Sequence, residues 1–458
     1  MTRSCLTVTL LAALSILAGC SESKPQPKAD PVTVTAAPAA PAADPDANAN
    51  LTPDERLALA KVKGDKGVDK AITDAQAVVR NNKEKNESWV VLGRQWVRKA
   101  RESADPGFYL NADACANIVL ARVPDSRIAL DLRGLVLLNA HKFDEARSLA
   151  LQITAKSPED PMAWGTLSDA YLEMGRYDEA TAATQTMVDL KPNLPSYSRA
   201  SYLQWLRGDT ASAKQTVRLA LDSGRAGKSD PEPGAWVLVQ AAMIFWHEGD
   251  YEGAEAGCDK ALERIGDYAP ANVCKGRVAA AKGDYRRAAE LFERAFKVSP
   301  LAETAWLMGD AKSAAGDTKG AEEAWATVER EGRRTDPRTL SLFFSAKNKN
   351  VDEALKLARE EYEVRKDITT EDALAWALHR AGKTQEAKAS IARARRLGTP
   401  DARLLYHEGA ILVAAGDVAK GTKRLEDALK SNPGFDIEGA RDAKALLAEH
   451  RPSLAALK

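Results

Sequence analysis

Residues 160–192 read DPMAWGTLSDAYLEMGRYDEATAATQTMVDLKP, and they are the most informative part of the sequence about its fold. Apolar residues recur at helical spacing on both sides of a short polar turn, which predicts two amphipathic helices. Gly175 supplies the left-handed residue that ends the first helix, and Pro192 cannot continue the second. A single helical hairpin cannot bury its own apolar faces, so this one needs neighbours of the same kind.

The spacing of large and small residues in this hairpin resembles the tetratricopeptide repeat, a helix-turn-helix unit of about 34 residues. The positions that carry the resemblance are Trp164, Leu167, Tyr171, Gly175, Tyr177, Ala180 and Pro192. In that family, successive hairpins twist into a right-handed superhelix whose first helices line a concave groove. The resemblance therefore implies an all-α, superhelical solenoid.

The rest of the chain supplies the neighbours. One small residue of each predicted second helix recurs with gaps of 33 or 34 residues and a single gap of 41. These residues are Ala112, Ala146, Ala180, Ala213, Ala254, Ala288, Ala321, Ala354, Ala387 and Gly421. A recurrent small residue lets two helices approach closely, so the constant gap indicates one contact repeated many times. We predict about ten helical hairpins over residues 53–435 and a C-terminal capping helix and tail over 436–458.

Three local departures from the repeat pattern are visible: the first unit, a turn after Arg101 that is lengthened by Ser103-Ala104-Asp105-Pro106-Gly107, and a turn without glycine at Asn348. Helical signals begin at Thr52-Pro53-Asp54-Glu55, an N-cap followed by a first-turn proline and two acids. Residues 57–80 are predicted to form a degenerate first hairpin. Asn348-Lys349-Asn350 replaces the glycine of the usual turn.

The N-terminus carries an export signal rather than part of the fold. Arg3 precedes an apolar run over residues 6–17, and Leu17-Ala18-Gly19-Cys20 follows. This order resembles a bacterial lipobox, which implies that residues 1–19 are a signal peptide and that Cys20 is lipidated; the alternative is an ordinary secretory signal that ends in cysteine. Residues 20–52 then form a lipid-anchored, Pro/Ala-rich flexible linker.

The residue after the predicted lipidated cysteine indicates in which membrane the protein is anchored. Ser21 stands where an aspartate looks like an inner-membrane retention signal in enteric bacteria. The resemblance therefore implies an outer-membrane lipoprotein, lipid-anchored and facing the periplasm.

Composition and motif spacing argue against several other classes of protein. Lys+Arg and Asp+Glu both number 65, so the basic excess of a nucleic-acid binder is missing. Gly227-Lys228-Ser229 lacks the earlier glycine of a phosphate loop, and neither His247-Glu248 nor His407-Glu408 is followed by the second histidine of a zinc protease. We predict no enzyme, no cofactor and no metal, and we expect His247 at the surface.

Two of the five cysteines are candidates for a disulfide. Cys258 falls on a predicted second helix, and Cys274 lies near the start of the next first helix. An exported protein experiences oxidising conditions that permit a bridge between them. The alternative is that both are buried thiols that pack like alanine.

Residues 235–246, AWVLVQAAMIFW, carry the functional prediction. This helix is apolar on every face, so it is either buried all round or offers a second apolar face to a partner. We predict that Trp236, Met243 and Trp246 line the concave groove. Equivalent positions of neighbouring first helices hold Tyr202, Trp205, Trp306, Phe343, Trp376 and Tyr406. The alternative is that the superhelix curls tightly and these residues pack on one another.

These features favour a membrane-anchored scaffold that binds protein partners, because aromatic anchors dominate many such interfaces. Lipoproteins that resemble this one serve pilus-secretin assembly, outer-membrane protein insertion or polysaccharide export. The second hypothesis is that the same groove binds a polysaccharide or a cell-wall fragment. Asp169, Asp310 and Asp372 on the first helices keep that alternative open.

Overall fold

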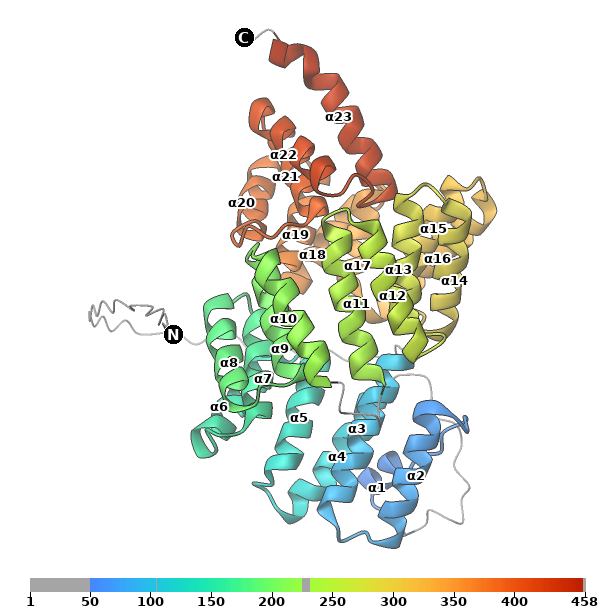
Figure 1. Ribbon diagram of the computed structural model, residues 1–458, viewed down its shortest axis with the longest axis vertical. Coiled ribbons are helices and arrows are strands. Elements are labelled where there is room, and N and C mark those ends of the chain that lie inside the picture. The colour runs from blue at the N-terminus through green and yellow to red at the C-terminus, as the bar shows by residue number, and fades with distance from the viewer. Residues whose placement is uncertain (1–49, 104, 225–230, 456–458) are drawn as a thin grey trace, which may run out of the picture. The chain divides into compact units, whose positions relative to one another are not determined.

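The computed structural model describes residues 50–103, 105–224 and 231–455, with side chains as far as residue 450. The predicted signal peptide, Cys20 and almost all of the predicted linker lie outside the described residues. Within them, every regular element is an α-helix, so the all-α prediction is confirmed (Figure 1).

The helices follow one another with short connections. The first twelve are α1 (Pro53–Ala58), α2 (Gly67–Asn81), α3 (Asn86–Ser103), α4 (Phe108–Arg122), α5 (Arg127–Asn139), α6 (Phe143–Lys156), α7 (Pro161–Glu173), α8 (Tyr177–Leu190), α9 (Leu194–Leu206), α10 (Thr210–Ser223), α11 (Glu232–His247) and α12 (Tyr251–Arg264). The others are α13 (Ala269–Ala281), α14 (Tyr285–Val298), α15 (Ala302–Ala314), α16 (Thr318–Thr335), α17 (Pro337–Ala346), α18 (Val351–Val364), α19 (Ile368–Arg380), α20 (Thr384–Ala394), α21 (Ala402–Ala414), α22 (Val418–Ser431) and α23 (Ile437–Ala455).

Helices α3 to α22 form ten consecutive antiparallel pairs, as the sequence predicts. In several pairs a buried serine of the first helix donates a hydrogen bond to the recurrent small residue of the second. Ser168 Oγ lies 3.1 Å from the Ala180 carbonyl oxygen, and Ser201 Oγ lies 2.8 Å from that of Ala213. Both alanines are fully buried. The small side chain therefore permits the close approach that the hydrogen bond requires.

The predicted degenerate first hairpin over residues 57–80 is wrong. The capping box at Thr52 starts α1, but α1 ends at Ala58 and packs against α4 rather than pairing with α2. Asn111 on α4 donates to the Leu57 carbonyl, and the Trp96 indole on α3 donates to that of Ala58. Side-chain donors thus satisfy the last carbonyls of a helix too short to be stable alone.

From α5–α6 onward, the turn inside each pair uses a left-handed residue. Gly175 has φ +71°, and Asn348 takes the same place between α17 and α18 with φ +49°. Asparagine tolerates this region better than most residues, which explains why the missing glycine does not disturb the repeat. The other turn glycines with positive φ are Gly208, Gly249, Gly283, Gly316, Gly382 and Gly416.

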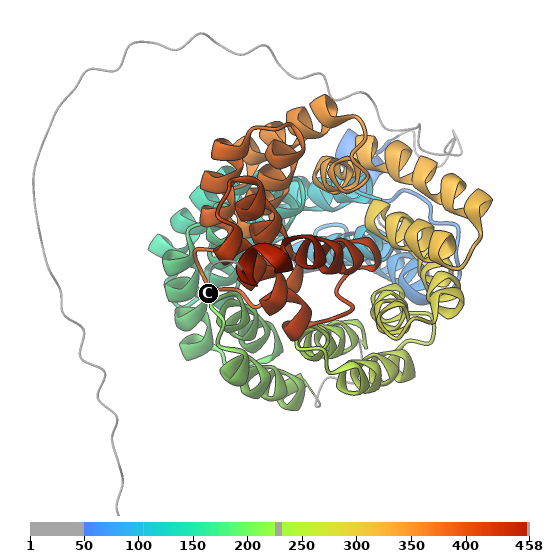
Figure 2. The ribbon, with the colours of Figure 1, turned by 90° about the horizontal axis from the view of Figure 1, so that it is seen from above.

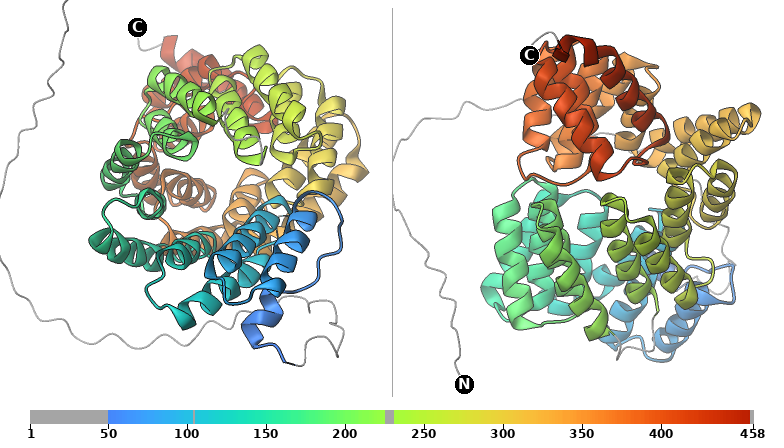
Figure 3. Two further views of the ribbon diagram at one scale, coloured as in Figure 1. Left: turned by 60° about the horizontal axis from the view of Figure 1, so that its bottom comes forward. Right: turned by 45° about the horizontal axis from the view of Figure 1, so that its top comes forward.

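Loops of the later pairs rest on turns of the earlier pairs, about 190 positions back in the sequence (Figure 3). The Lys366 amide donates to the Glu173 carbonyl at 2.8 Å, and the Ile368 amide donates to the Tyr177 hydroxyl at 2.8 Å. Thr399 Oγ1 donates to the Leu206 carbonyl at 2.5 Å. These bonds stack one superhelical turn on the next.

The same arrangement continues one repeat further along. Asn432 donates to the Trp246 carbonyl at 2.7 Å, and its side-chain oxygen accepts from the Tyr251 hydroxyl at 2.8 Å. Three successive loops, after α18, α20 and α22, therefore sit on three successive hairpin turns. This regular contact brings the first helices of the two superhelical turns close together.

Candidate functional site

The nine predicted groove residues lie on first helices, but they differ widely in exposure. Trp205, Trp246, Phe343, Trp376 and Tyr406 are buried, and Met243 and Trp306 are half-buried. Tyr202 is 38% exposed and Trp236 is 42% exposed. The aromatic set is thus mostly packed within the protein, with two rings on α9 and α11 left open to solvent.

One aromatic cluster lies where α9 and α11 meet the start of α21. The His247 ring lies 4.6 Å from the Trp205 ring and 5.0 Å from the Trp246 ring, centre to centre. Its Nδ1 lies 3.7 Å from an Asp401 carboxylate oxygen. The expectation that His247 is a surface residue is therefore wrong, because the next superhelical turn covers the end of α11.

Burial lowers the pKa of His247 to about 4, even though Asp401 acts in the opposite direction. Arg277 and Arg403 also lower this pKa. A neutral imidazole between two indoles is consequently the stable form near pH 7. Protonation would place an additional positive charge beside two arginines in a site with little water.

We expect the protein to lose stability on acidification through His247. Its unfolded pKa is 6.5, so the unfolded chain binds more protons than the folded chain between pH 6.5 and about 4. Stability is therefore lost as the pH falls through that range, by about 2 kcal/mol at pH 5 relative to pH 7. Urea unfolding of the wild type and of His247→Gln at both pH values measures this loss. Equal pH slopes for the two proteins would contradict the assignment.

A second aromatic cluster joins α19 and α21 to the segment that precedes α23. The Trp376 ring stacks on His407 at 4.1 Å and contacts Tyr406 at 5.4 Å. Tyr406 in turn lies 5.7 Å from Phe435, which is only 4% exposed. The residues predicted to hold a partner therefore hold a part of this chain.

Sequence reasoning missed the basic residues of this face. Lys347, Arg380 and Arg403 lie at the end of α17, at the end of α19 and at the start of α21. Arg380 stacks on Trp376, with the guanidinium carbon 4.5 Å from the ring centre. The available signal was a positive charge at groove-facing positions of consecutive first helices, next to the aromatic residues.

A cavity of about 30 Å³ lies between this face and the start of α23. Trp306, Trp376, Tyr406, Arg380 and Arg403 line one side, and residues 435–442 supply the other. This volume holds a water molecule or two and is too small for a sugar or a peptide side chain. A larger cavity of about 220 Å³ lies among α12, α13 and α14 and includes none of the predicted groove residues.

The three aspartates that kept polysaccharide binding open are all engaged by protein groups. Asp169 accepts two hydrogen bonds from the Arg199 guanidinium, at 2.8 and 2.6 Å. Asp310 accepts from Trp325 and Lys347, and burial raises its pKa to about 7. Asp372 Oδ1 lies 2.8 Å from His407 Nδ1. In the described residues no observation favours sugar binding over protein binding.

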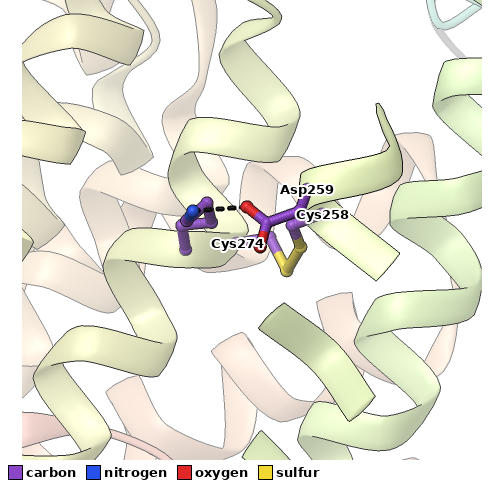
Figure 4. The surroundings of a disulfide bond; sticks show 4 residues. Cys258, Asp259 and Cys274 are labelled. Carbon is purple, nitrogen blue, oxygen red and sulfur yellow. Dashed lines mark hydrogen bonds and ion pairs between the residues drawn. A yellow bond between two sulfur atoms is a disulfide. The ribbon is translucent and has the colours of Figure 1, made fainter. Parts of the chain in front are cut away.

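The structure joins Cys258 on α12 and Cys274 on α13 in a disulfide, with the Cα atoms 6.5 Å apart (Figure 4). Both cysteines are buried, and Asp259 pairs with Lys275 beside them. Cys115 is a buried free thiol on α4. The bridge fastens one repeat to the next.

We expect reduction of this disulfide to lower the free energy of unfolding by about 3 kcal/mol, since it closes a loop of 16 residues. Urea unfolding with and without reductant measures the loss. Cys258→Ala/Cys274→Ala should show the lower stability in both conditions. In denaturant the oxidised mature chain should expose one titratable thiol, that of Cys115; three thiols would contradict the bridge.

The described residues contain no cluster of three or more histidine, cysteine or acidic side chains that could hold a metal ion. Among them there is also no helix with both the length and the apolar character that a membrane span requires.

Ten stacked helical hairpins with a recurrent small residue, a left-handed turn and a concave face of first helices define a tetratricopeptide repeat solenoid. Family models of the tetratricopeptide repeat match residues 137–204 and 275–308. The TPR repeat-containing protein PA0015 of Pseudomonas aeruginosa is 36% identical over 92 residues, which are 19% of this chain and 80% of that protein. The chain belongs to the tetratricopeptide repeat family. Repeats of this family bind protein partners and are typically non-catalytic.

Solved structures similar to this chain include PilW, described as a widely conserved type IV pilus biogenesis factor. PilW shows 15% identity and a TM-score of 0.39, and the match covers 46% of this chain and 96% of that one. PilF of Pseudomonas aeruginosa shows 13% identity and a TM-score of 0.38, and the match covers 45% of this chain and 92% of PilF. The human IFIT1 dimer with PPP-AAAA shows 15% identity and a TM-score of 0.45, and the match covers 84% of this chain and 96% of the IFIT1 chain. At these TM-scores the likenesses carry no conclusion about this chain.

Proposed function

We propose that this protein is a lipid-anchored scaffold that binds protein partners on the periplasmic side of the outer membrane, in the assembly of an envelope machine. The proposed localisation is supported by the lipobox-like order of residues that ends at Cys20. The scaffold role rests on the family of the repeats. Polysaccharide binding is not carried forward, because its candidate carboxylates have protein partners.

One observation supports the location of the partner-binding site. Tyr202 and Trp236 keep about two fifths of their surface exposed, although the neighbouring aromatic residues of the first helices are buried. Large exposed rings on a concave face are costly in water and often mark an interface. With the half-buried Met243, these rings on α9 and α11 form the partner surface of this proposal.

Site-specific cross-linking in living cells tests this surface. A photoreactive amino acid at position 202 or 236 should yield discrete protein adducts. The same amino acid at Leu219 or Val298, which are equally exposed on second helices, should yield none. Equal adducts from all four positions would contradict the proposal.

Tyr202→Ala/Trp236→Ala should reduce the adducts formed from a probe at Met243 by about tenfold or more, because aromatic anchors commonly contribute about 2 kcal/mol. The double variant should unfold within about 1 kcal/mol of the wild type, since both rings are exposed. Leu219→Ala is the matched control. Unchanged adducts in the double variant would show that these rings do not bind the partner.

A further inference from the structure

The C-terminal segment of the chain lies on the concave face of the later repeats. Beyond Asn432 the chain places Phe435 against Tyr406, and α23 then runs across the first helices α21 and α15 (Figure 2). Ala440, Ala443 and Leu447 form the buried face of α23. We expected a helix that only caps the end of the stack; α23 packs on α22 as a cap does, but it also covers the predicted groove.

The charges of the two surfaces are complementary. The face contributes Lys347, Arg380 and Arg403, whereas the segment contributes three acids, Asp436, Glu438 and Asp442. Glu438 Oε1 lies 2.6 Å from Lys347 Nζ, and both groups are largely shielded from solvent. Such pairing of an acidic helix start with a basic face fixes the orientation and register of the helix.

The fit of α23 on this face is incomplete. Within the described residues, neither Trp306 Nε1 nor Arg403 Nε has a hydrogen-bond partner, although both atoms are buried. Both residues line the 30 Å³ cavity beside Asp436 and Asp442. An occupant with a carboxylate or amide placed in this cavity would accept hydrogen bonds from both donors directly.

Resting on the function proposed above, we propose that the concave face of α15, α17, α19 and α21 is a docking groove for an acidic helix of a partner protein. The partner helix begins with an aromatic residue that packs on Tyr406 and carries acids that pair with Lys347, Arg380 and Arg403. Helix α23 occupies the groove until that partner displaces it. The open rings Tyr202 and Trp236 on the earlier turn stay accessible throughout.

A physical consequence is that the affinity for the partner is masked. The free chain is binding-competent only in the fraction of molecules whose α23 has left the face, and the apparent dissociation constant rises in inverse proportion to that fraction. Weakening the hold of α23 should therefore tighten binding in trans, without any change in the groove itself.

The test measures the binding of a fluorescent peptide to the full-length protein. The peptide has the sequence of residues 433–450, PGFDIEGARDAKALLAEH. Anisotropy should show at least tenfold tighter binding to the release variant Phe435→Ala/Glu438→Lys than to the wild type. Adding Arg403→Glu to the release variant should return the affinity for the peptide to that of the wild type or below. Adding Lys420→Glu, a charge change of the same size on exposed Lys420 of α22, should not.

Three results would overturn this inference. The release variant could bind the peptide no better than the wild type, or Arg403→Glu and Lys420→Glu could have the same effect. The release variant could also fail to bind the peptide and form a dimer that sedimentation detects. That result would show that α23 of a second copy occupies the groove.

Hydrogen exchange of the wild type gives a measurement that does not depend on the folding of any variant. Amides of Ile437–Leu447 should exchange faster than those of α21, and saturating peptide should speed them further while α21 stays protected. Equal protection of both helices, unaffected by the peptide, would overturn the proposal. Failure of the peptide experiments with intact cross-links from positions 202 and 236 would refute this inference and leave the proposed scaffold function standing.

Discussion

Gly175→Ala is expected to destabilise the protein by about 2–5 kcal/mol, more than the about 1–2 kcal/mol expected for the same change at Gly382. Both glycines are turn residues with almost the same left-handed conformation, at φ +71° and +70°. That conformation costs an alanine about 1–2 kcal/mol in either place. A Cβ at Gly175 would also collide with the Lys366 carbonyl oxygen of the next superhelical turn, whereas a Cβ at Gly382 meets nothing within 4 Å.

The collision adds about 1–3 kcal/mol, as overpacking does in protein interiors. It would push apart the hydrogen bond from the Lys366 amide to the Glu173 carbonyl. Urea unfolding followed by circular dichroism measures the two losses, and hydrogen exchange should place the extra loss in α7, α8 and the start of α19. Equal losses for Gly175→Ala and Gly382→Ala would show that the two superhelical turns do not pack on each other.

Cys20→Ser is expected to release the protein from the membrane completely. Each buried methylene of an acyl chain contributes about 0.8 kcal/mol, and more than one chain is needed for firm anchoring. The resemblance to a lipobox implies several chains on Cys20 and none elsewhere. The variant should therefore move from the membrane pellet to the soluble fraction and lose the mass of the lipid.

Cys5→Ser is the matched control, because it makes the same chemical change within the segment that is predicted to be removed. It should leave the wild type's distribution and mature mass unchanged. Wild-type protein with an unmodified cysteine at its mature N-terminus would contradict the lipid anchor. So would a Cys20→Ser protein that stays in the membrane pellet after a high-salt wash.

The repeat architecture could be predicted from the sequence because each repeat is a local object. The turn at Gly175 and the small residue at Ala180 act within a single hairpin, and about 34 residues contain every contact that forms it. The same reasoning explains the turn at Asn348, where asparagine replaces glycine in a left-handed position. It fails for α1, whose carbonyls bond to side chains on α3 and α4 instead of to a neighbour in sequence.

The state of the concave face could not be predicted from the sequence, because it depends on contacts between residues far apart in the chain, some of them about 190 positions apart. A periodic pattern shows which residues face inward but not how far the inner surface opens. Trp376 and Tyr406, which we predicted to line the groove, are buried, and Tyr406 packs against Phe435. Trp236, another aromatic residue predicted to line the groove, remains open.

Short-range spacing and left-handed turn residues are sufficient to predict the helical hairpins from α3 onward and most of their turns from the sequence. Only the packing of the whole chain shows which aromatic rings stay exposed, that His247 is shielded by the next superhelical turn, and that a C-terminal helix with acids near its start covers the basic part of the groove. The physical reason is that burial depends on which distant segments meet, and a hairpin pattern repeated along the chain contains no information about that meeting.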